Sequence, residues 1–314
     1  MSLDFEAPIE ELEKKIEDLK KQAPESGDGI DKQVSGLQTE LLGLKKKIYS
    51  NLSPWQRVQL ARHPERPLIR DYISLAFDEF IELHGDRCFG DDRALLGGFA
   101  TIDKHKVMLL GFSKGRGVED KIKDNFGMAH PEGYRKALRL MKLAEKYQIP
   151  VVSLVDTPAA YPGAAAEERG QAEAIARNLT EMAGLETPII AIITGEGGSG
   201  GALGIAVADT VMMLSNAIYS VIPPEGCAAI LWKDSSKAPE AAEALKITAK
   251  SLLELGVIDG IIDEPLGGAN TDHAATAMAL RMALIKQVGA LKRTSPRKLV
   301  GKRLDKFAAM GRYK

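Results

Sequence analysis

The sequence has few of the residues on which several classes of protein depend. Cysteine occurs only at Cys88 and Cys227, which excludes a disulfide framework and a thiol-rich zinc site. Aromatic residues make up 5% of the 314 residues, too few for a carbohydrate cleft or a base-stacking platform built from many rings. The four histidines of the N-terminal half lack the spacing that places two metal ligands on one helix face. We therefore expect no metal site in this chain.

A charge excess and a long apolar run are also missing. The 42 basic and 43 acidic residues leave a net charge of −1, which argues against a nucleic-acid partner. The nearest approach to a membrane span, Ala202–Leu214, contains Asp209 and is shorter than the roughly 18 residues required. The N-terminus carries Asp4 and Glu6 instead of the cationic residues of a secretory signal. These features predict a cytoplasmic protein with no membrane partner.

The charge is nevertheless unevenly distributed. Residues 291–314 contain nine basic residues and one acid, Asp305, so this segment carries +8 and the rest of the chain −9. Such a run indicates a solvated or docking terminal segment, or a contact with an acidic partner surface or a phosphate. We treat residues 291–314 as a basic C-terminal tail.

Two helical patterns precede the main body of the chain. Ile9, Leu12, Ile16 and Leu19 follow spacings of three and four, and a second apolar repeat runs over residues 30–48. The turn-forming segment Gln22–Gly29 separates them. Residues 1–53 are therefore predicted to form an antiparallel helical hairpin used for packing or assembly, with a lone interaction arm as the alternative.

From residue 94 onward the pattern is α/β. Helical patterns begin at Pro131, cover about 167–182 and start again at Pro224. Alternation of strands and helices favours a doubly wound sheet, whereas the extra strand pairs suit a stacked spiral of β-β-α units. Periodicity alone does not separate the two. The expected strands cover 95–102, 106–112, 151–155, 188–194, 211–214 and 218–222.

The excess of glycine is concentrated in Gly195–Gly204, which reads GEGGSGGALG between a strand and a short helix. Glycine allows a ligand to approach the backbone closely, and N–H groups at a helix start attract an anion or a developing oxyanion. Tight helix–strand packing is the alternative. A P-loop is excluded because no lysine ends the motif, and a dinucleotide fingerprint fits poorly so late in the chain.

The same loop also matches the nucleophile-elbow pattern G-x-S-x-G, with Ser199 at its centre. A serine hydrolase would then use His273 as its base and Asp259 or Asp263 as its acid. We keep this reading as the alternative, because a pattern of only glycine and serine matches easily in a glycine-rich loop.

Two further loops are candidates for ligand binding. Residues 156–163 (DTPAAYPG) follow a buried strand, at the sheet edge where α/β proteins bind ligands. Residues 114–117 (KGRG), with Lys121 and Lys123, form a basic loop that would either hold a phosphate or stay solvated. No nucleophile–base pair is evident, so we expect catalysis by positioning and backbone donors.

The chain resembles the carboxyltransferase alpha subunits of bacterial acetyl-CoA carboxylase. This resemblance covers nearly the whole chain and implies the crotonase-like α/β spiral of β-β-α units, with residues 54–290 as the carboxyltransferase domain. The stretches that carry it are ELHGDR (82–87), DNFGM (124–128), HPEGYRKALRLMK (130–142), DTPAAYPG (156–163), AEERGQAEAIARNL (166–179), GEGGSGGALGIAV (195–207), YSVIPPEGCAAILWK (219–233) and DEPLGGA (263–269).

The resemblance implies a transferase that moves the carboxyl group of carboxybiotin to acetyl-CoA. The product would be malonyl-CoA, in the first committed step of fatty-acid biosynthesis. Biotin would be covalently bound to a separate biotin carboxyl carrier protein, and ATP would be used only elsewhere in the complex, by biotin carboxylase. A beta subunit, in an alpha2beta2 heterotetramer, would supply most of the acetyl-CoA side and a zinc ribbon.

The resemblance also implies roles for individual residues. The N–H groups of Gly197 and Gly198 would hold the ureido oxygen of biotin as catalytic donors. Three following residues, Ser199, Gly200 and Gly201, would shape the carboxybiotin pocket. The wall beside it would be lined by Tyr161, Pro162 and Gly163. One departure is Ala159, which stands where the family has glycine in DTPGAYPG and would shift this loop slightly.

Overall fold

The structure, a computed structural model, describes residues 3–22 and 29–311. Its centre is a sheet with the strand order β1-β2-β3-β4-β5-β6-β8, and β7 pairs with the end of β5. The strands are β1 (Glu79–Glu82), β2 (Leu95–Ile102), β3 (His105–Phe112), β4 (Val151–Thr157), β5 (Ile189–Gly198), β6 (Thr210–Leu214), β7 (Ile218–Ser220) and β8 (Gly260–Ile262).

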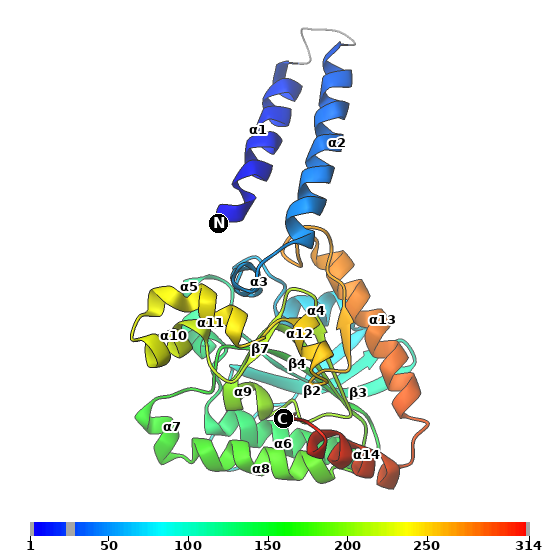
Figure 1. Cartoon of the computed structure of the whole chain (residues 1–314). Helices are drawn as coiled ribbons and strands as arrows, with labels where there is room; N and C mark the ends of the chain where they lie inside the picture. The colour runs from blue at the N-terminus through cyan, green and yellow to red at the C-terminus, as the bar shows by residue number, and fades with distance from the viewer. Residues whose placement is uncertain (1–2, 23–28, 312–314) are drawn as a thin grey trace.

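Helices surround this sheet, as Figure 1 shows: α6 and α8 lie below it in that view, and α3 and α4 lie above it. The helices are α1 (Ala7–Gln22), α2 (Gly29–Ser50), α3 (Pro54–Ala61), α4 (Ile69–Ala76), α5 (Gly117–Lys123), α6 (Pro131–Lys146), α7 (Ala164–Glu168), α8 (Gln171–Gly184), α9 (Ser199–Leu203), α10 (Pro224–Trp232), α11 (Ala238–Ala244), α12 (Ala249–Glu254), α13 (His273–Leu291) and α14 (Pro296–Ala308).

The strand pairing explains why the apolar runs come in two kinds. β2 and β3 form the expected antiparallel hairpin, which turns at Asp103, whereas β3, β4, β5 and β6 are parallel neighbours. All seven residues of β4 are buried, as expected for a parallel strand covered on both faces. β5 changes partner along its length, because Ile190–Ile193 pairs with β6 and Glu196–Gly198 pairs with β7. β7 thus takes the place of β6 beside the end of β5, which still pairs with β4 on its other side.

Three expected boundaries are wrong. The helix expected over 167–182 is two helices, α7 and α8, because Gly170 between them adopts φ 82°, a conformation that interrupts a helix. The strand expected to end at 194 continues to Gly198, and the strand expected over 218–222 ends at Ser220. The last two differences arise from one event, since the extension of β5 pairs with β7.

The N-terminal helices form the expected antiparallel hairpin, which extends away from the sheet (Figure 1). Lys45 of α2 pairs with Glu13 of α1 at 2.6 Å, and Tyr49, further along α2, bonds to Glu6, before α1 begins. Residue numbers therefore rise along one helix as they fall along the other. Most of the predicted break at Gln22–Gly29 lies outside the described residues.

The basic C-terminal segment is partly built into the body of the protein. Arg303 of α14 is 1% exposed and donates to both carboxylate oxygens of Asp209, at 3.0 and 2.8 Å. Its guanidinium also donates to the carbonyl oxygens of Met182, Leu185 and Thr187. Among the described residues of the tail, this arginine is therefore structural, not solvated.

One described helix, α13, is long and apolar enough to cross a membrane by length and composition alone. From the sequence, residues 202–214 and not this helix were expected to be the nearest approach to a membrane span. Leu280, Leu284 and Val288 of α13 are fully buried against the body, and Arg281 pairs with Asp78 at 2.9 Å. One face of α13 therefore packs against the body, whereas Met278 and Met282 on the helix are 54 and 61% exposed, as in a helix at a protein surface.

Candidate functional site

The glycine-rich segment is a strand end followed at once by a helix, not the loop that the sequence predicted. Gly197 pairs with Thr157 of β4 on one side and with Tyr219 of β7 on the other, and Gly198 pairs with Ser220. Helix α9 then begins at Ser199, which has φ 53°. The junction therefore combines the end of a strand, where Gly198 has a partner on one side only, with the unpaired N–H groups of a first helical turn.

Close packing accounts for five of the six glycines in this segment. A Cβ on Gly198 would lie 1.9 Å from the carbonyl oxygen of Pro158, and one on Gly201 would lie 2.4 Å from the backbone nitrogen of Ala160. Only Gly200 has room, since the nearest atom would be 3.8 Å away. Tight helix–strand packing, the alternative to a binding role, therefore explains most of these glycines. The other three glycines, each with a Cβ contact of 2.7 Å or less, are Gly195, Gly197 and Gly204.

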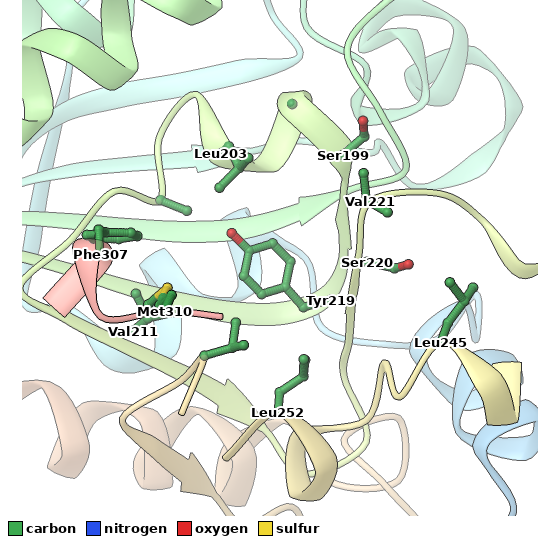
Figure 2. Close-up of a pocket in the computed structure, with 13 residues that line it drawn as sticks. Ser199, Leu203, Val211, Tyr219, Ser220, Val221, Leu245, Leu252, Phe307 and Met310 are labelled. Carbon is green, nitrogen blue, oxygen red and sulfur yellow. The ribbon is translucent and has the colours of Figure 1, made fainter. Parts of the chain in front are cut away.

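An apolar pocket of about 380 Å³ opens beside the start of α9 (Figure 2). None of its lining residues is charged, and burial raises the pKa of Tyr219 to about 12, so this phenol stays protonated at neutral pH. An uncharged ring system with one or two polar atoms suits such walls. The pocket is lined by Ser199, Gly200, Leu203, Ala206, Val211, Tyr219, Ser220, Val221, Leu245, Leu252, Val257, Phe307 and Met310.

The predicted donors Gly197 and Gly198 lie on a different hollow from Ser199 and Gly200. They line a niche of about 20 Å³ together with Pro158, Arg62 and Glu196. Gly201 is buried against the loop after β4 and lines neither hollow. The structure thus brings five predicted residues into one short segment but divides their exposed surfaces between two cavities.

The residues predicted for the neighbouring wall lie farther along the loop that follows β4. The ring of Tyr161 stacks on His130, with 4.2 Å between the ring centroids, and Gly163 lies beneath the same ring. Neither these residues nor Pro162 lines the pocket or the niche. Ala159 has no positive φ, so its methyl group causes no backbone strain in place of the family's glycine.

Buried ion pairs hold the ends of β4 and β5 together, and sequence reasoning missed them. Lys114 donates to Asp156 at 2.7 Å and to Glu196 at 3.0 Å, and Arg62 pairs with Glu196 at 2.7 Å and with Glu225 at 2.5 Å. The sequence did contain a sign of these pairs. Asp156 and Glu196 lie near the ends of two buried strands, and buried carboxylates require cations.

The pKa values in this cluster follow from those pairs. Burial lowers the pKa of Lys114, but the charges of Asp156 and Glu196 raise it above its ordinary value. Burial raises the pKa of Glu196, and Lys114 and Arg62 more than offset it, so that carboxyl titrates below its ordinary value. Lys114 is therefore charged and held by two carboxylates, which favours a structural role for it over the binding of a phosphate.

The serine hydrolase alternative finds no catalytic geometry. His273 begins α13, and its Nε2 lies 2.7 Å from the carbonyl oxygen of Glu65. Asp259 accepts from the backbone of Val211 and from Lys306. Within the part of the chain that the structure describes, the hydroxyl of Ser199 bonds to no histidine or carboxylate. The same described residues contain no group of three or more histidines, cysteines or acids arranged for a metal ion.

Comparison with protein families gives one full-length match. The model described as "Acetyl co-enzyme A carboxylase carboxyltransferase-like" matches residues 2–311. The chain is 55% identical over 314 residues to the acetyl-coenzyme A carboxylase carboxyl transferase subunit alpha of Gemmatimonas aurantiaca, covering 99% of this chain and 98% of that one. It is also 55% identical over 318 residues to the subunit of that name from Geobacter metallireducens, with the same two coverages.

Solved structures of lower identity share the fold. The geranyl-CoA carboxylase beta subunit of P. aeruginosa aligns with a TM-score of 0.57 and 16% identity, over 78% of this chain and 46% of that one. Transcarboxylase 12S aligns with a TM-score of 0.55 and 22% identity, over 70% of this chain and 42% of that one. These likenesses show the fold, and the chain has the expected crotonase-like α/β fold.

Proposed function

This chain belongs to the family of acetyl-CoA carboxylase carboxyltransferase alpha subunits, and we propose that it supplies the carboxybiotin side of a two-subunit active site. Carboxybiotin, held on a carrier protein, supplies the carboxyl group that acetyl-CoA accepts to form malonyl-CoA. The observation that carries the assignment of sides is the pocket beside α9, which is apolar, uncharged and bordered by first-turn N–H groups.

The chemistry of this pocket matches an uncharged ring with a polar oxygen better than a coenzyme A. No lysine or arginine lines it, whereas the phosphates of coenzyme A require cations. A pocket of about 380 Å³ is in the range that small ligands occupy. This division leaves acetyl-CoA largely to the partner subunit.

The donors for the ureido oxygen would come from the β5–α9 junction. Gly197 and Gly198 remain our proposed catalytic donors, acting from the niche that they line, and Ser199 and Gly200 extend the donor set into the larger pocket. Gly201 acts by packing α9 against Ala160. A preorganised backbone N–H at such a position is worth about 3–4 kcal/mol to a transition state. Tyr161, Pro162 and Gly163 would meet the carrier or the partner instead of the ring itself.

An exposed apolar surface next to the pocket marks where the beta subunit would dock. Ile230, Leu231 and Trp232 at the end of α10 are 69, 63 and 40% exposed, and Val221, which lines the pocket, is 75% exposed. Large apolar side chains with this much exposure are typical of a subunit interface. We propose that the beta subunit covers it in an alpha2beta2 assembly, with zinc on that subunit, and that the biotin carboxyl carrier protein and biotin carboxylase complete a cytoplasmic complex.

The direct test is the reverse reaction, malonyl-CoA-dependent carboxylation of free biotin, with and without the cognate beta subunit. We expect turnover only with both subunits. Gly200→Val should fill the pocket from a position where a Cβ has room, and should lower the rate roughly a hundredfold by displacing the ligand. Gly198→Ala is unsuitable, because its Cβ would collide with Pro158 whether or not its N–H is a donor.

Gly184→Val is the matched control, since a Cβ on Gly184 meets no atom within 4 Å and this residue ends α8, outside the pocket lining. It should leave the rate within about twofold of wild type. Absence of turnover with a folded beta subunit would overturn the proposed function. Turnover by this chain alone would overturn the division of the site between subunits.

A further inference from the structure

Another cavity lies between the β2–β3 turn and the end of α13. Its volume is about 490 Å³, and it is lined by Asp103, Lys104, His105, Ile285, Lys286, Gly289, Ala290, Lys292 and Arg293. Gly289 adds open space, because a Cβ there would meet no atom within 4 Å. We refer to this cavity as the basic groove.

The basic groove has a strong excess of positive charge. Lys104, Lys286, Lys292 and Arg293 are exposed, and none of them pairs with a carboxylate among residues 3–22 and 29–311. Asp103 is the single acid in the lining. Cations at the C-terminus of a helix also complement its dipole, but that explanation does not extend to Lys104, which comes from the β2–β3 turn.

The basic groove is separate from the glycine junction. In the parallel part of the sheet Met108, Val151 and Ile189 are aligned across β3, β4 and β5. His105 lies three residues before Met108, whereas Gly197 lies eight residues beyond Ile189. At about 3.3 Å per residue, more than 25 Å separates the two levels along the strands. The groove is thus at the amino ends of the strands, and the junction is at their carboxyl ends.

The pKa of His105 reflects the positive charge of the groove. Burial lowers its pKa, and Lys292 and Lys104 lower it further, while Asp103 acts in the opposite direction. The ring is therefore neutral at neutral pH and surrounded by cations. An anion placed among those cations would favour the protonated ring, so it would bind with uptake of a proton.

We propose that the basic groove is a binding site for a small ligand that carries at least two phosphate-type negative charges. Lys104, Lys292 and Arg293 contact the anion from two sides, and Lys286 and the ring of His105 complete the cradle. This site would use Lys292 and Arg293, two of the cations of the basic C-terminal segment that the fold leaves exposed. It rests on the groove alone and is independent of the proposed transferase function.

The test is calorimetric titration of the full chain with pyrophosphate at low ionic strength, with sulfate and inorganic phosphate as separate arms. We expect one saturable site per chain. The double variant Lys292→Ser/Arg293→Ser should weaken binding at least about tenfold, because two nearby charges are lost. The control Lys298→Ser/Lys302→Ser removes the same charge from exposed residues of α14 outside the groove, and should change affinity less than about twofold.

The pH dependence gives a second readout. Sulfate keeps its charge between pH 5.5 and 8, about the range in which histidine titrates. Its affinity should rise as the pH falls through that range, and His105→Gln should abolish the rise. Equal losses in the two double variants would show an effect of net charge only and would overturn the proposal. Absence of saturable pyrophosphate binding, or binding only of an acidic polymer, would overturn it as well.

Discussion

Two groups of cations, at opposite ends of the parallel strands, have different surroundings. At the carboxyl ends of the strands Arg62, Arg66 and Lys114 are each paired with a buried carboxylate, and the pocket beside them has no charge. At the amino ends, the cations of the basic groove face solvent without carboxylate partners among the described residues.

The difference teaches that burial, not the local density of lysine and arginine, decides what a cation does. A buried cation must be paired, and pairing makes it structural. An exposed cation retains its hydration and stays available to a ligand. The basic loop at 114–117 and the basic tail looked equivalent in the sequence, yet Lys114 is in the first class and Lys292 is in the second.

The largest effect should come from Arg303, a buried and paired cation at the amino ends of the strands. It tests whether burial, and not position in the sheet, decides the role of a cation. Arg303→Ala leaves Asp209 and three backbone carbonyls without their donor, so we expect a loss of about 4 kcal/mol in the free energy of unfolding. Arg297→Ala, at an exposed position on the same helix, should cost less than about 0.5 kcal/mol. Urea denaturation measures both, and similar costs would contradict the distinction between buried and exposed cations.

A smaller loss should follow from Lys114→Met at the carboxyl edge. Asp156 and Glu196 would lose a shared cation, but Glu196 would keep Arg62. We expect a cost of about 3 kcal/mol together with reduced turnover, because the ends of β4 and β5 would separate. Lys123→Met, an exposed residue from the neighbouring α5, is the control and should unfold like wild type in the same urea titration.

The smallest effect should be an acid-induced loss of stability at the carboxyl edge. The pKa of Glu196 and that of Glu264 lie below the ordinary 4.5 in the folded chain, because paired cations outweigh burial. A lowered pKa stabilises the fold fully above pH 4.5, and that contribution is lost as the pH falls through the folded value. Unfolding free energies measured from pH 7 to 3.5 should stay level and then decline below about 4.5. A level profile to pH 3.5 would contradict the buried pairs.

Strand and helix identity was largely predictable because it depends on local pattern. The runs at 95–102 and 151–155 became β2 and β4, and Pro131 begins α6 as expected. The split at Gly170 was missed because a single glycine inside a helical pattern gives no sign of whether its φ will be positive. The extension of β5 to Gly198 was missed because it depends on pairing with β7, which follows later in the chain.

The candidate site, too, was predictable only in part. Sequence pointed to Gly197–Gly201 and to the loop after β4, and the structure brings Gly198 against Pro158 and Gly201 against Ala160. It could not show that Tyr161 stacks on His130 and lies outside the pocket lining, nor that Phe307 and Met310 of the C-terminal segment form part of the pocket wall. Those contacts join residues far apart in the chain, and no local pattern encodes them.

By itself the sequence determined the family, the α/β class, the helical hairpin and the place of the glycine junction, because each follows from periodicity or from short-range motifs. Only the tertiary structure decided which charges are buried. It paired Lys114 with Asp156 and Glu196, tied Arg303 to Asp209, and left Lys292 and Arg293 facing a groove. The physical reason is that the energy of a charge depends on its solvation and its partners, and both are properties of the folded chain.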